Sequence, residues 1–370
     1  MEKLIQVLGR ETLDLIIRKK YDGNQIGIGY HADADGVIGA VCIKAAIKKI
    51  FEALGFEEQD DLKEANISYI PLQYGMNGTQ NIEKLQGKNL IIFIDFCPAI
   101  NELEMLRDCG TYFIDIYDHH KTQLEKVLME KESLNESNIR FHFNNDKAGC
   151  GIAFEQFINE SAYDKNFIEN LKFFSDYAED RDLWKFKLVD SKVINMGINL
   201  ILEKFELITN PELFLDFINC SLKNEEIILF NELFQEEELD NPLKIQIKLH
   251  ELGNSKLFID NLAINKIFKK GKANKIPKIK LFGIELCIFN NSNLISEVGN
   301  TLTKLNFPSC QWFVVHEPFK QPEVVLSFRS SDDLPDVSLI AKALGGGGHR
   351  NACGATIPLN KLENLLKGII

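Results

Sequence analysis

Histidine and aspartate side chains gather in one short stretch of this chain. His31-Ala-Asp33-Ala-Asp35-Gly36 places one imidazole and two carboxylates directly after the apolar run Ile26–Tyr30. Mixed imidazole and carboxylate ligands are typical of Mn²⁺, Fe²⁺ or Zn²⁺ sites, whereas Ca²⁺ prefers a shell of oxygen atoms. The stretch therefore predicts half of a metal site, on the loop between a short buried strand and a following helix.

An EF-hand calcium loop would also alternate acidic residues before a glycine. With His31 at the first position, Gly36 falls at the sixth, as that loop requires. The twelfth position, however, is Cys42, where an EF-hand needs a bidentate glutamate. We therefore exclude an EF-hand.

Two further polar groups follow apolar runs. Asp95-Phe-Cys-Pro98 comes after Leu90–Ile94, and Asp118-His119-His120 comes after a second apolar run. A lone aspartate at a strand end is often a helix N-cap, but capping alone does not explain three such groups. The carboxylates also outnumber the needs of one ion. Two cations at such a site can clamp an in-line phosphoryl displacement, so the expected substrate is a phosphate ester.

The positioning elements form a βαβ pattern, which predicts an α/β fold whose N-terminal sheet is mainly parallel with helices on both faces. The expected strands of this sheet are 26–30, 67–72, 90–95, 112–117 and 139–143, with a helix over 37–51. A smaller C-terminal α/β domain is expected from strands 280–289, 311–316 and 323–328 and a helix near 338–344. The predicted domains are 1–192 (catalytic and metal-binding), 193–275 (helical connector) and 276–370 (substrate-binding), with the active-site cleft between the first and the last.

Composition excludes several classes of protein. The chain has 370 residues, 45% of them apolar, and a net charge of −12, which disfavours a protein that coats nucleic acid with its whole surface. Eight cysteines without a CxxC pair, no secretory pattern at the start and no long apolar run predict a cytoplasmic protein without membrane contact. The lysine-rich stretch 266–280 is interpreted as a solvated loop, with a track for nucleic acid as the alternative.

Taken in order, these motifs resemble those of the DHH phosphoesterase superfamily, in its oligoribonuclease or RecJ-like branch. Ser327-Phe-Arg329-Ser and the glycine-rich Gly345–Gly354 segment are similar to the DHH-associated C-terminal domain of that family. The resemblance implies two ions. One would be held by His31, Asp33 and Asp95, and the other by Asp35, Asp95, His119 and a further aspartate, Asp182 in preference to Asp180.

The resemblance also implies roles for neighbouring residues. His120 would face the substrate phosphate and Asp118 would orient His119, while Asp33 or His120 could assist proton transfer. In the C-terminal domain, Arg329, His349 and the backbone of Gly346, Gly347 and Gly348 would bind a substrate phosphate. A P-loop is excluded, because His349-Arg350 replaces its Lys-Ser/Thr pair.

The expected function is that of a two-metal, Mn²⁺-dependent phosphodiesterase or exonuclease that converts short single-stranded oligonucleotides or dinucleotides to 5′-monophosphates, with Mg²⁺ or Co²⁺ as substitutes. Three alternatives stay open: a single-stranded DNA 5′–3′ exonuclease, a 3′-phosphoadenosine 5′-phosphate phosphatase, and a nucleotide-binding pseudoenzyme. The sequence does not decide between RNA and DNA, the physiological metal, or the oligomeric state, for which a homodimer is one option.

Overall fold

The computed structural model describes residues 26–53, 67–74, 79–130, 138–268, 276–292, 294–315 and 321–369. They divide into two compact units. The first comprises the described residues up to Leu257 except His120–Lys126, and the second comprises His120–Lys126 and Phe258–Ile370. The domain boundaries and the cleft expected from the sequence stay predictions.

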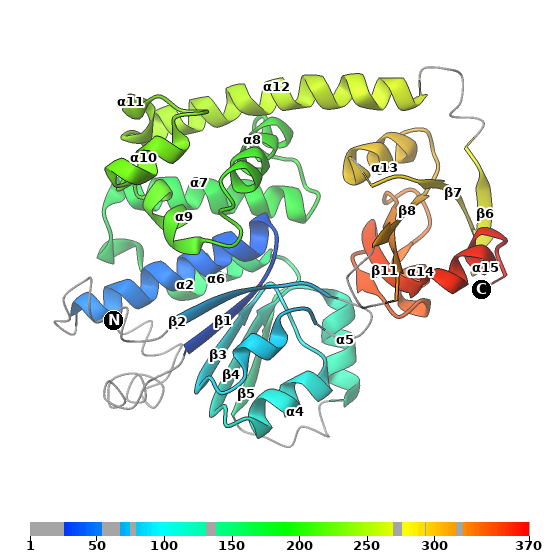
Figure 1. Cartoon of the computed structure of the whole chain (residues 1–370), viewed down its shortest axis with the longest axis horizontal. Coiled ribbons are helices and arrows are strands. Elements are labelled where there is room, and N and C mark those ends of the chain that lie inside the picture. The colour runs from blue at the N-terminus through cyan, green and yellow to red at the C-terminus, as the bar shows by residue number, and fades with distance from the viewer. Residues whose placement is uncertain are drawn as a thin grey trace. The chain divides into compact units, whose positions relative to one another are not determined.

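The first unit is built on a parallel sheet of five strands (Figure 1). These strands are β1 (Ile26–His31), β2 (Ile67–Leu72), β3 (Leu90–Ile94), β4 (Phe113–Asp118) and β5 (Ile139–Phe143). Their order is β2-β1-β3-β4-β5, and every neighbouring pair is parallel. The predicted mainly parallel N-terminal sheet is thus confirmed, and the carboxyl ends of its strands share one edge.

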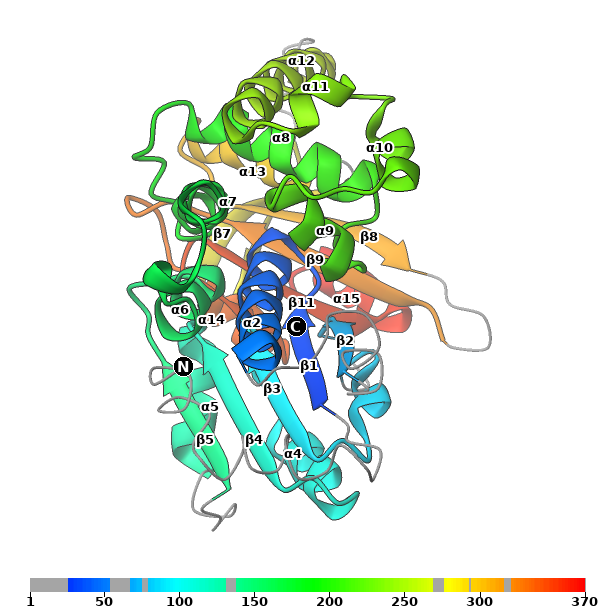
Figure 2. The same ribbon diagram turned by 90° about the vertical axis from the view of Figure 1, so that its left-hand side faces the viewer.

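Helices cover both faces of this sheet (Figure 2). Ile28 and Ile92 lie in the core shared with α2 (Ala34–Ala53) and α6 (Gly149–Phe157). Phe93, next to Ile92, lies in the core on the opposite face, because successive strand residues point to opposite sides. That second core is covered by η1 (Ile82–Leu85), α4 (Ile100–Asp108) and the end of α5 (Lys121–Glu130).

A run of helices follows the sheet, as the sequence predicts. They are η3 (Glu160–Ala162), α7 (Lys165–Asp182), α8 (Ser191–Lys204), α9 (Pro211–Ile218), α10 (Asn224–Phe230), α11 (Glu236–Leu239) and α12 (Pro242–Phe268). Ile198, Phe214 and Phe217 are completely buried in the same core as Ile28. Helices α8 and α9 are therefore integral to the first unit, where they support the layer of α2.

The second unit contains a smaller, mostly antiparallel sheet of order β10-β11-β9-β8-β7-β6. Its strands are β6 (Lys278–Leu281), β7 (Ile284–Asn290), β8 (Ser309–Val315), β9 (Glu323–Arg329), β10 (Gly347–Gly348) and β11 (Ala352–Pro358). Its helices are α13 (Ile295–Thr303), α14 (Ser338–Ala343), η5 (Leu359–Lys361) and α15 (Leu362–Leu366). This arrangement confirms the smaller C-terminal α/β domain.

One expected strand was wrong. The run 280–289 is split between β6 and β7, which form an antiparallel hairpin. Phe282 and Gly283 turn the chain with φ of 47° and 87°. A phenylalanine at a left-handed position carries no turn signal, so the apolar pattern concealed the bend. Part of the lysine-rich stretch 266–280 lies outside the described residues.

No helix in the described part of the chain is long and apolar enough to cross a membrane.

Candidate metal centre and phosphate-binding residues

The polar groups that follow three strands of the parallel sheet meet at its carboxyl edge. His31 ends β1, Asp95 follows β3, and His119 follows β4. Asp35, expected on a loop, lies instead in the first turn of α2, and Asp182 is the last residue of α7. Asp33 stays in the short connection before α2, where its Oδ1 accepts a hydrogen bond from the Gly36 amide at 3.0 Å.

The first cluster of ligand atoms joins His31, Asp33 and Asp95. His31 Nδ1 lies 2.9 Å from Asp33 Oδ2 and 3.5 Å from Asp95 Oδ2. The Asp33 side chain is 42% exposed, whereas that of Asp95 is 2% exposed. The cluster therefore has one open carboxylate and one buried carboxylate.

The second cluster joins Asp35, His119 and Asp182. His119 Nε2 lies 3.5 Å from Asp35 Oδ2 and 3.4 Å from Asp182 Oδ2. It also lies 3.0 Å from Asp95 Oδ1, the oxygen that does not face His31. Asp95 thus presents one oxygen to each cluster, which is the arrangement expected of a carboxylate shared by two ions.

The electrostatics of these groups fit cation binding. Burial raises the pKa of Asp35 well above its usual range, and the nearby carboxylates of Asp95 and Asp182 raise it further. Burial lowers the pKa of His31 and His119, but neighbouring carboxylates outweigh it and raise both pKa values well above the usual range. Four carboxylates packed this closely repel one another unless positive charge lies between them. Imidazole and carboxylate donors suit a divalent transition metal at that place.

The backbone around Asp95 is shaped for this arrangement. Asp95 has a left-handed φ of 55°, a costly conformation for a residue with a Cβ, and its amide donates to the Tyr117 carbonyl at 2.8 Å. Gly149 packs directly against it, since a Cβ at Gly149 would lie 2.4 Å from Asp95 Cβ. The strained residue is the one shared by both clusters, which is where strain is most often tied to function.

The N-terminus of α6 forms a support that the sequence analysis did not assign. The amides of Gly149 and Cys150 each donate to one oxygen of Asp35, at 2.7 Å. Both are helix N-terminal amides, which favour a negative charge. The Gly-Cys-Gly spacing was the available signal, because only glycine at 149 lets the helix approach this closely.

The structure separates the two candidates for the last aspartate. Asp182 points to His119, as given above, whereas Asp180 accepts hydrogen bonds from the amides of Lys187 and Leu188 at 2.9 and 3.2 Å. Asp180 therefore holds the loop after α7 and belongs to neither of the two clusters described above. The geometry favours Asp182, as the sequence analysis did.

Asp118 acts on the backbone of the DHH segment. Its Oδ1 accepts a hydrogen bond from the amide of His119 at 2.8 Å, and the residue is completely buried. This contact is with the main chain of His119, so orientation of the imidazole by Asp118 stays a prediction.

In the second unit, Arg329 ends β9 with its guanidinium held by three neighbours. Nη1 donates to Ser327 Oγ at 2.9 Å and to the Phe328 carbonyl at 2.8 Å, and Nη2 donates to Ser296 Oγ at 3.0 Å. Its stem crosses α13 at Gly299, where a Cβ would lie 2.5 Å from Arg329 Cγ. These three acceptors are neutral oxygen atoms, and together they orient the guanidinium.

Backbone groups of the glycine-rich segment make structural contacts within the second unit. Gly346 donates to the Ala341 carbonyl at 2.8 Å and Gly348 donates to Thr122 Oγ1 at 3.3 Å, so these two amides already have acceptors. Gly347 pairs with Gly354 in the β10–β11 ladder. Among the predicted phosphate-binding residues of this segment, His349 is the one whose side chain could contact a phosphate.

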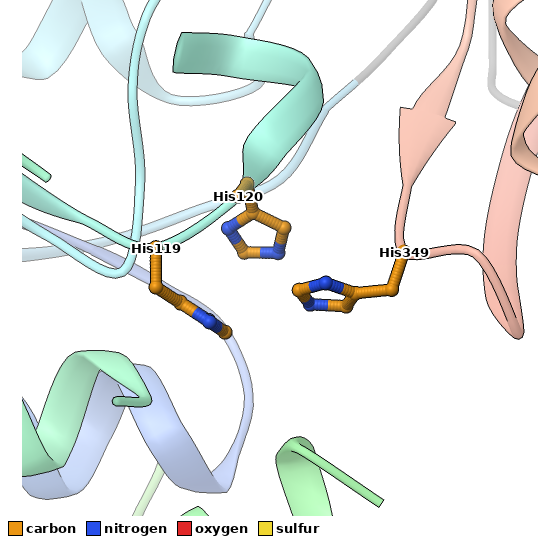
Figure 3. A group of neighbouring side chains, drawn as sticks. All are labelled: His119, His120 and His349. Atoms are coloured by element: carbon orange, nitrogen blue, oxygen red, sulfur yellow. The ribbon is translucent and has the colours of Figure 1, made fainter. Parts of the chain in front are cut away.

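His349 stacks on His120 within the second unit (Figure 3). The ring centroids lie 5.0 Å apart at an angle of 23°. His120 directly follows His119 in the chain. The two histidines predicted to contact phosphate are therefore neighbours.

Comparison with known proteins matches residues 297–370 to the DHHA1 domain. These residues form a DHHA1 domain. The solved structure of a DHH domain, described as belonging to a family of ribosomal proteins, is 14% identical over all of this chain and 90% of its own, with a TM-score of 0.53. This likeness shows the fold, and with the DHHA1 match it supports the DHH phosphoesterase superfamily with a C-terminal DHHA1 domain.

Two other similarities extend beyond the DHHA1 domain. An uncharacterized protein of Acanthamoeba polyphaga mimivirus is 28% identical over 302 residues, which are 78% of this chain and 58% of that protein. This chain thus spans less than two thirds of that relative. RecJ of Thermus thermophilus, solved with Mn²⁺, is 16% identical over 98% of this chain and 53% of its own, with a TM-score of 0.49.

Proposed function

We propose that this chain is a two-metal phosphodiesterase or exonuclease that hydrolyses short single-stranded oligonucleotides or dinucleotides to 5′-monophosphates. The observation that carries the proposal is the position of Asp95. Its two oxygens face His31 at 3.5 Å and His119 at 3.0 Å, so one buried carboxylate serves two clusters of ligands. Clusters that share a carboxylate are suited to a pair of ions acting on a single phosphate.

The proposed ligands follow from the geometry of the first unit. His31, Asp33 and Asp95 would hold one Mn²⁺, and Asp35, Asp95, His119 and Asp182 would hold the other. When bound, the ions would lower the pKa of water and polarise a phosphoryl oxygen. Amides at the N-terminus of α6 orient Asp35, and Asp118 contacts the His119 amide, which supports this assignment.

Asp33 is an ionised and partly exposed carboxylate of the first cluster. Burial raises its pKa, but the imidazole of His31 outweighs burial, and the pKa lies below the usual range. The carboxylate is thus ionised at neutral pH, and its side chain is 42% exposed. A low pKa makes this carboxylate a weak base, so we keep both Asp33 and His120 as candidates to assist proton transfer from an attacking water.

Phosphate recognition is assigned to Arg329, His349 and His120. A guanidinium offers planar paired donors to phosphate oxygens, and the two stacked imidazoles offer further N–H groups. Gly346, Gly347 and Gly348 would contribute space beside the phosphate. We also keep as proposals a cytoplasmic location, substitution of Mn²⁺ by Mg²⁺ or Co²⁺, and assembly as a homodimer.

A substrate panel tests the proposal. The purified chain, supplied with Mn²⁺, is given a 5′-phosphorylated RNA dinucleotide, longer RNA, single-stranded DNA and 3′-phosphoadenosine 5′-phosphate. We expect fastest turnover of the dinucleotide, with 5′-monophosphates as products. Cleavage of the long DNA alone would contradict the proposed substrate class, and cleavage of the bisphosphate alone would indicate the phosphatase.

Metal content provides a separate test. Mass spectrometry or elemental analysis after Mn²⁺ loading should give about two ions per chain. Absence of turnover on every substrate together with less than one bound ion would support the nucleotide-binding pseudoenzyme instead.

A further inference from the structure

Tyr74 is an aromatic residue beside the metal-binding side chains that no part of the proposed chemistry uses. It lies just after β2, and its ring stacks on Phe96 with centroids 4.1 Å apart at an angle of 18°. Phe96 is completely buried and directly follows Asp95. One face of the Tyr74 ring therefore packs against the segment that carries the shared carboxylate, Asp95.

The hydroxyl group fixes the ring in its plane. The amide of Cys97 donates to the Tyr74 hydroxyl at 3.2 Å, and the hydroxyl lies 3.4 Å from the Cys97 carbonyl. Both polar groups of one peptide segment thus hold the tip of the side chain. A ring held at its tip and on one face loses little further freedom when a ligand covers the other face.

Tyr74 itself is partly exposed to solvent. The residue is 39% exposed, although the ring it covers is fully buried. Its centroid lies 6.1 Å from that of His31, which belongs to the first cluster. An aromatic side chain with exposed surface therefore lies beside a side chain proposed to hold metal, where the base of a bound nucleotide could meet it.

We propose that Tyr74 is a stacking platform for the nucleobase of the nucleotide whose phosphate is cleaved. The inference rests on the proposed function and adds a specificity-determining residue to it. Every base has a π-face, so a platform without base-edge donors accepts all four bases and discriminates against substrates that lack a base. Tyr74 would thus select nucleotides over other phosphate diesters without reading sequence.

Kinetics with an abasic substrate test this role. We compare wild type, Tyr74→Leu and Tyr74→Phe on a dinucleotide and on the same compound with its bases removed one at a time. We expect Tyr74→Leu to raise KM for the intact dinucleotide about 10-fold with little change in kcat. For the compound that lacks the stacked base, wild type and Tyr74→Leu should behave alike. Tyr74→Phe keeps the ring and should stay close to wild type.

Fluorescence gives a readout that a merely structural role would not move. A dinucleotide with a non-hydrolysable phosphonate linkage and 2-aminopurine at each position in turn is titrated onto the Mn²⁺-loaded chain. We expect quenching at one position, lost in Tyr74→Leu and retained in Tyr74→Trp. The matched control is Tyr112→Leu, because Tyr112 is 50% exposed but precedes β4, at the amino end of the sheet.

The outcomes separate this inference from the proposed function. If wild type cleaves the dinucleotide and Tyr74→Leu lowers activity equally on intact and abasic substrates, the stacking role is wrong while the activity stands. If wild type cleaves neither, the proposed function fails first. If the Tyr74→Leu chain does not fold, judged by its melting temperature, Tyr74→Trp decides. Absence of 2-aminopurine quenching when the dinucleotide binds to that variant would also overturn the stacking role.

Discussion

The candidate sites of the two units are built in opposite ways. In the first unit, acidic side chains from separate segments meet at the carboxyl edge of a parallel sheet, and their negative charge is balanced only in part by His31 and His119. In the second unit, the guanidinium of Arg329 is oriented by hydroxyl and carbonyl oxygens, which are neutral acceptors. The first site is thus built from groups that could hold cations, whereas the second is built around an oriented guanidinium.

Loss of the shared carboxylate should have the largest effect, because it acts on turnover and on both metal positions. Asp95→Asn removes the charge that faces both clusters, so we expect turnover to fall by about 1,000-fold or more, since metal ions contribute several kcal/mol of transition-state stabilisation. The number of bound Mn²⁺ ions should fall as well. Steady-state kinetics and elemental analysis of the same preparation measure the two effects.

Asp115→Asn is a matched control for that change. Asp115 is also a completely buried aspartate of the first unit, but its oxygens accept from Arg140 Nε and Nη2 at 2.5 and 2.6 Å. The control should lower stability and leave the metal content unchanged. Equal metal content in Asp95→Asn and wild type would contradict a shared carboxylate.

Asp35→Ala should remove one of the two proposed metal positions of the first site and leave the other. Its carboxylate faces His119, whereas the cluster around His31 does not include it. We expect turnover to be abolished while one ion stays bound, measured by elemental analysis. Loss of both ions, or retention of both, would argue against two separable metal positions.

The pair Asp180 and Asp182 sharpens the comparison within one helix. Asp182→Asn should reduce metal binding, while Asp180→Asn should keep the metal and lower the free energy of unfolding by about 1–3 kcal/mol, because the amides of Lys187 and Leu188 lose a charged acceptor. Denaturation curves and metal analysis of both variants distinguish the two roles. The reverse result would make Asp180 the ligand.

The Asp180 contribution should depend on pH. Burial raises its pKa, but hydrogen bonds from Ser191, Lys187 and Leu188 outweigh burial and place the pKa below the usual range. Stability from this carboxylate is therefore present above the unfolded pKa of about 3.9 and is lost as the pH falls through the folded pKa. The difference in unfolding free energy between wild type and Asp180→Asn should shrink there. A constant difference down to that pH would argue against an ionised role.

Arg329→Ala should have a smaller effect than loss of Asp95, because it removes binding and leaves the metal centre intact. Hydrogen bonds to charged groups contribute about 1.5–3 kcal/mol, so we expect KM to rise by roughly 10- to 150-fold. Metal content should stay at the wild-type level. A change in metal content would show that the two sites are not independent.

The sequence revealed the first site more fully than the second for a physical reason. Parallel strands bring their carboxyl ends together, so polar residues after apolar runs, such as His31, Asp95 and His119, can be grouped from their places in the sequence alone. Asp180 and Asp182 could not be separated in this way. They lie about 200° apart around α7, and the loop that engages Asp180 is fixed by tertiary contacts.

The supports of the second site are the least visible in the sequence. Gly299 lies inside α13, and Ser296 is an ordinary polar residue of the same helix. Nothing in their spacing predicts that one makes room for the stem of Arg329 and that the other accepts from its guanidinium. These contacts exist because α13 packs against β9 in the folded chain. The two elements are distant in sequence, so the sequence pattern does not reveal the contacts.

Gly299→Ala should therefore have the smallest of these effects, and it tests the supports directly. In a helix interior, alanine is favoured over glycine by about 0.5–1 kcal/mol, so propensity alone predicts a more stable chain. The added Cβ would lie 2.5 Å from Arg329 Cγ, so the arginine must move. We expect KM to rise about 10-fold or less, at or below the lower end of the range for loss of one charged hydrogen bond, at constant metal content. Asn300→Ala, on the next residue of the helix, is the control, and unchanged KM in Gly299→Ala would show that Arg329 needs no fixed position.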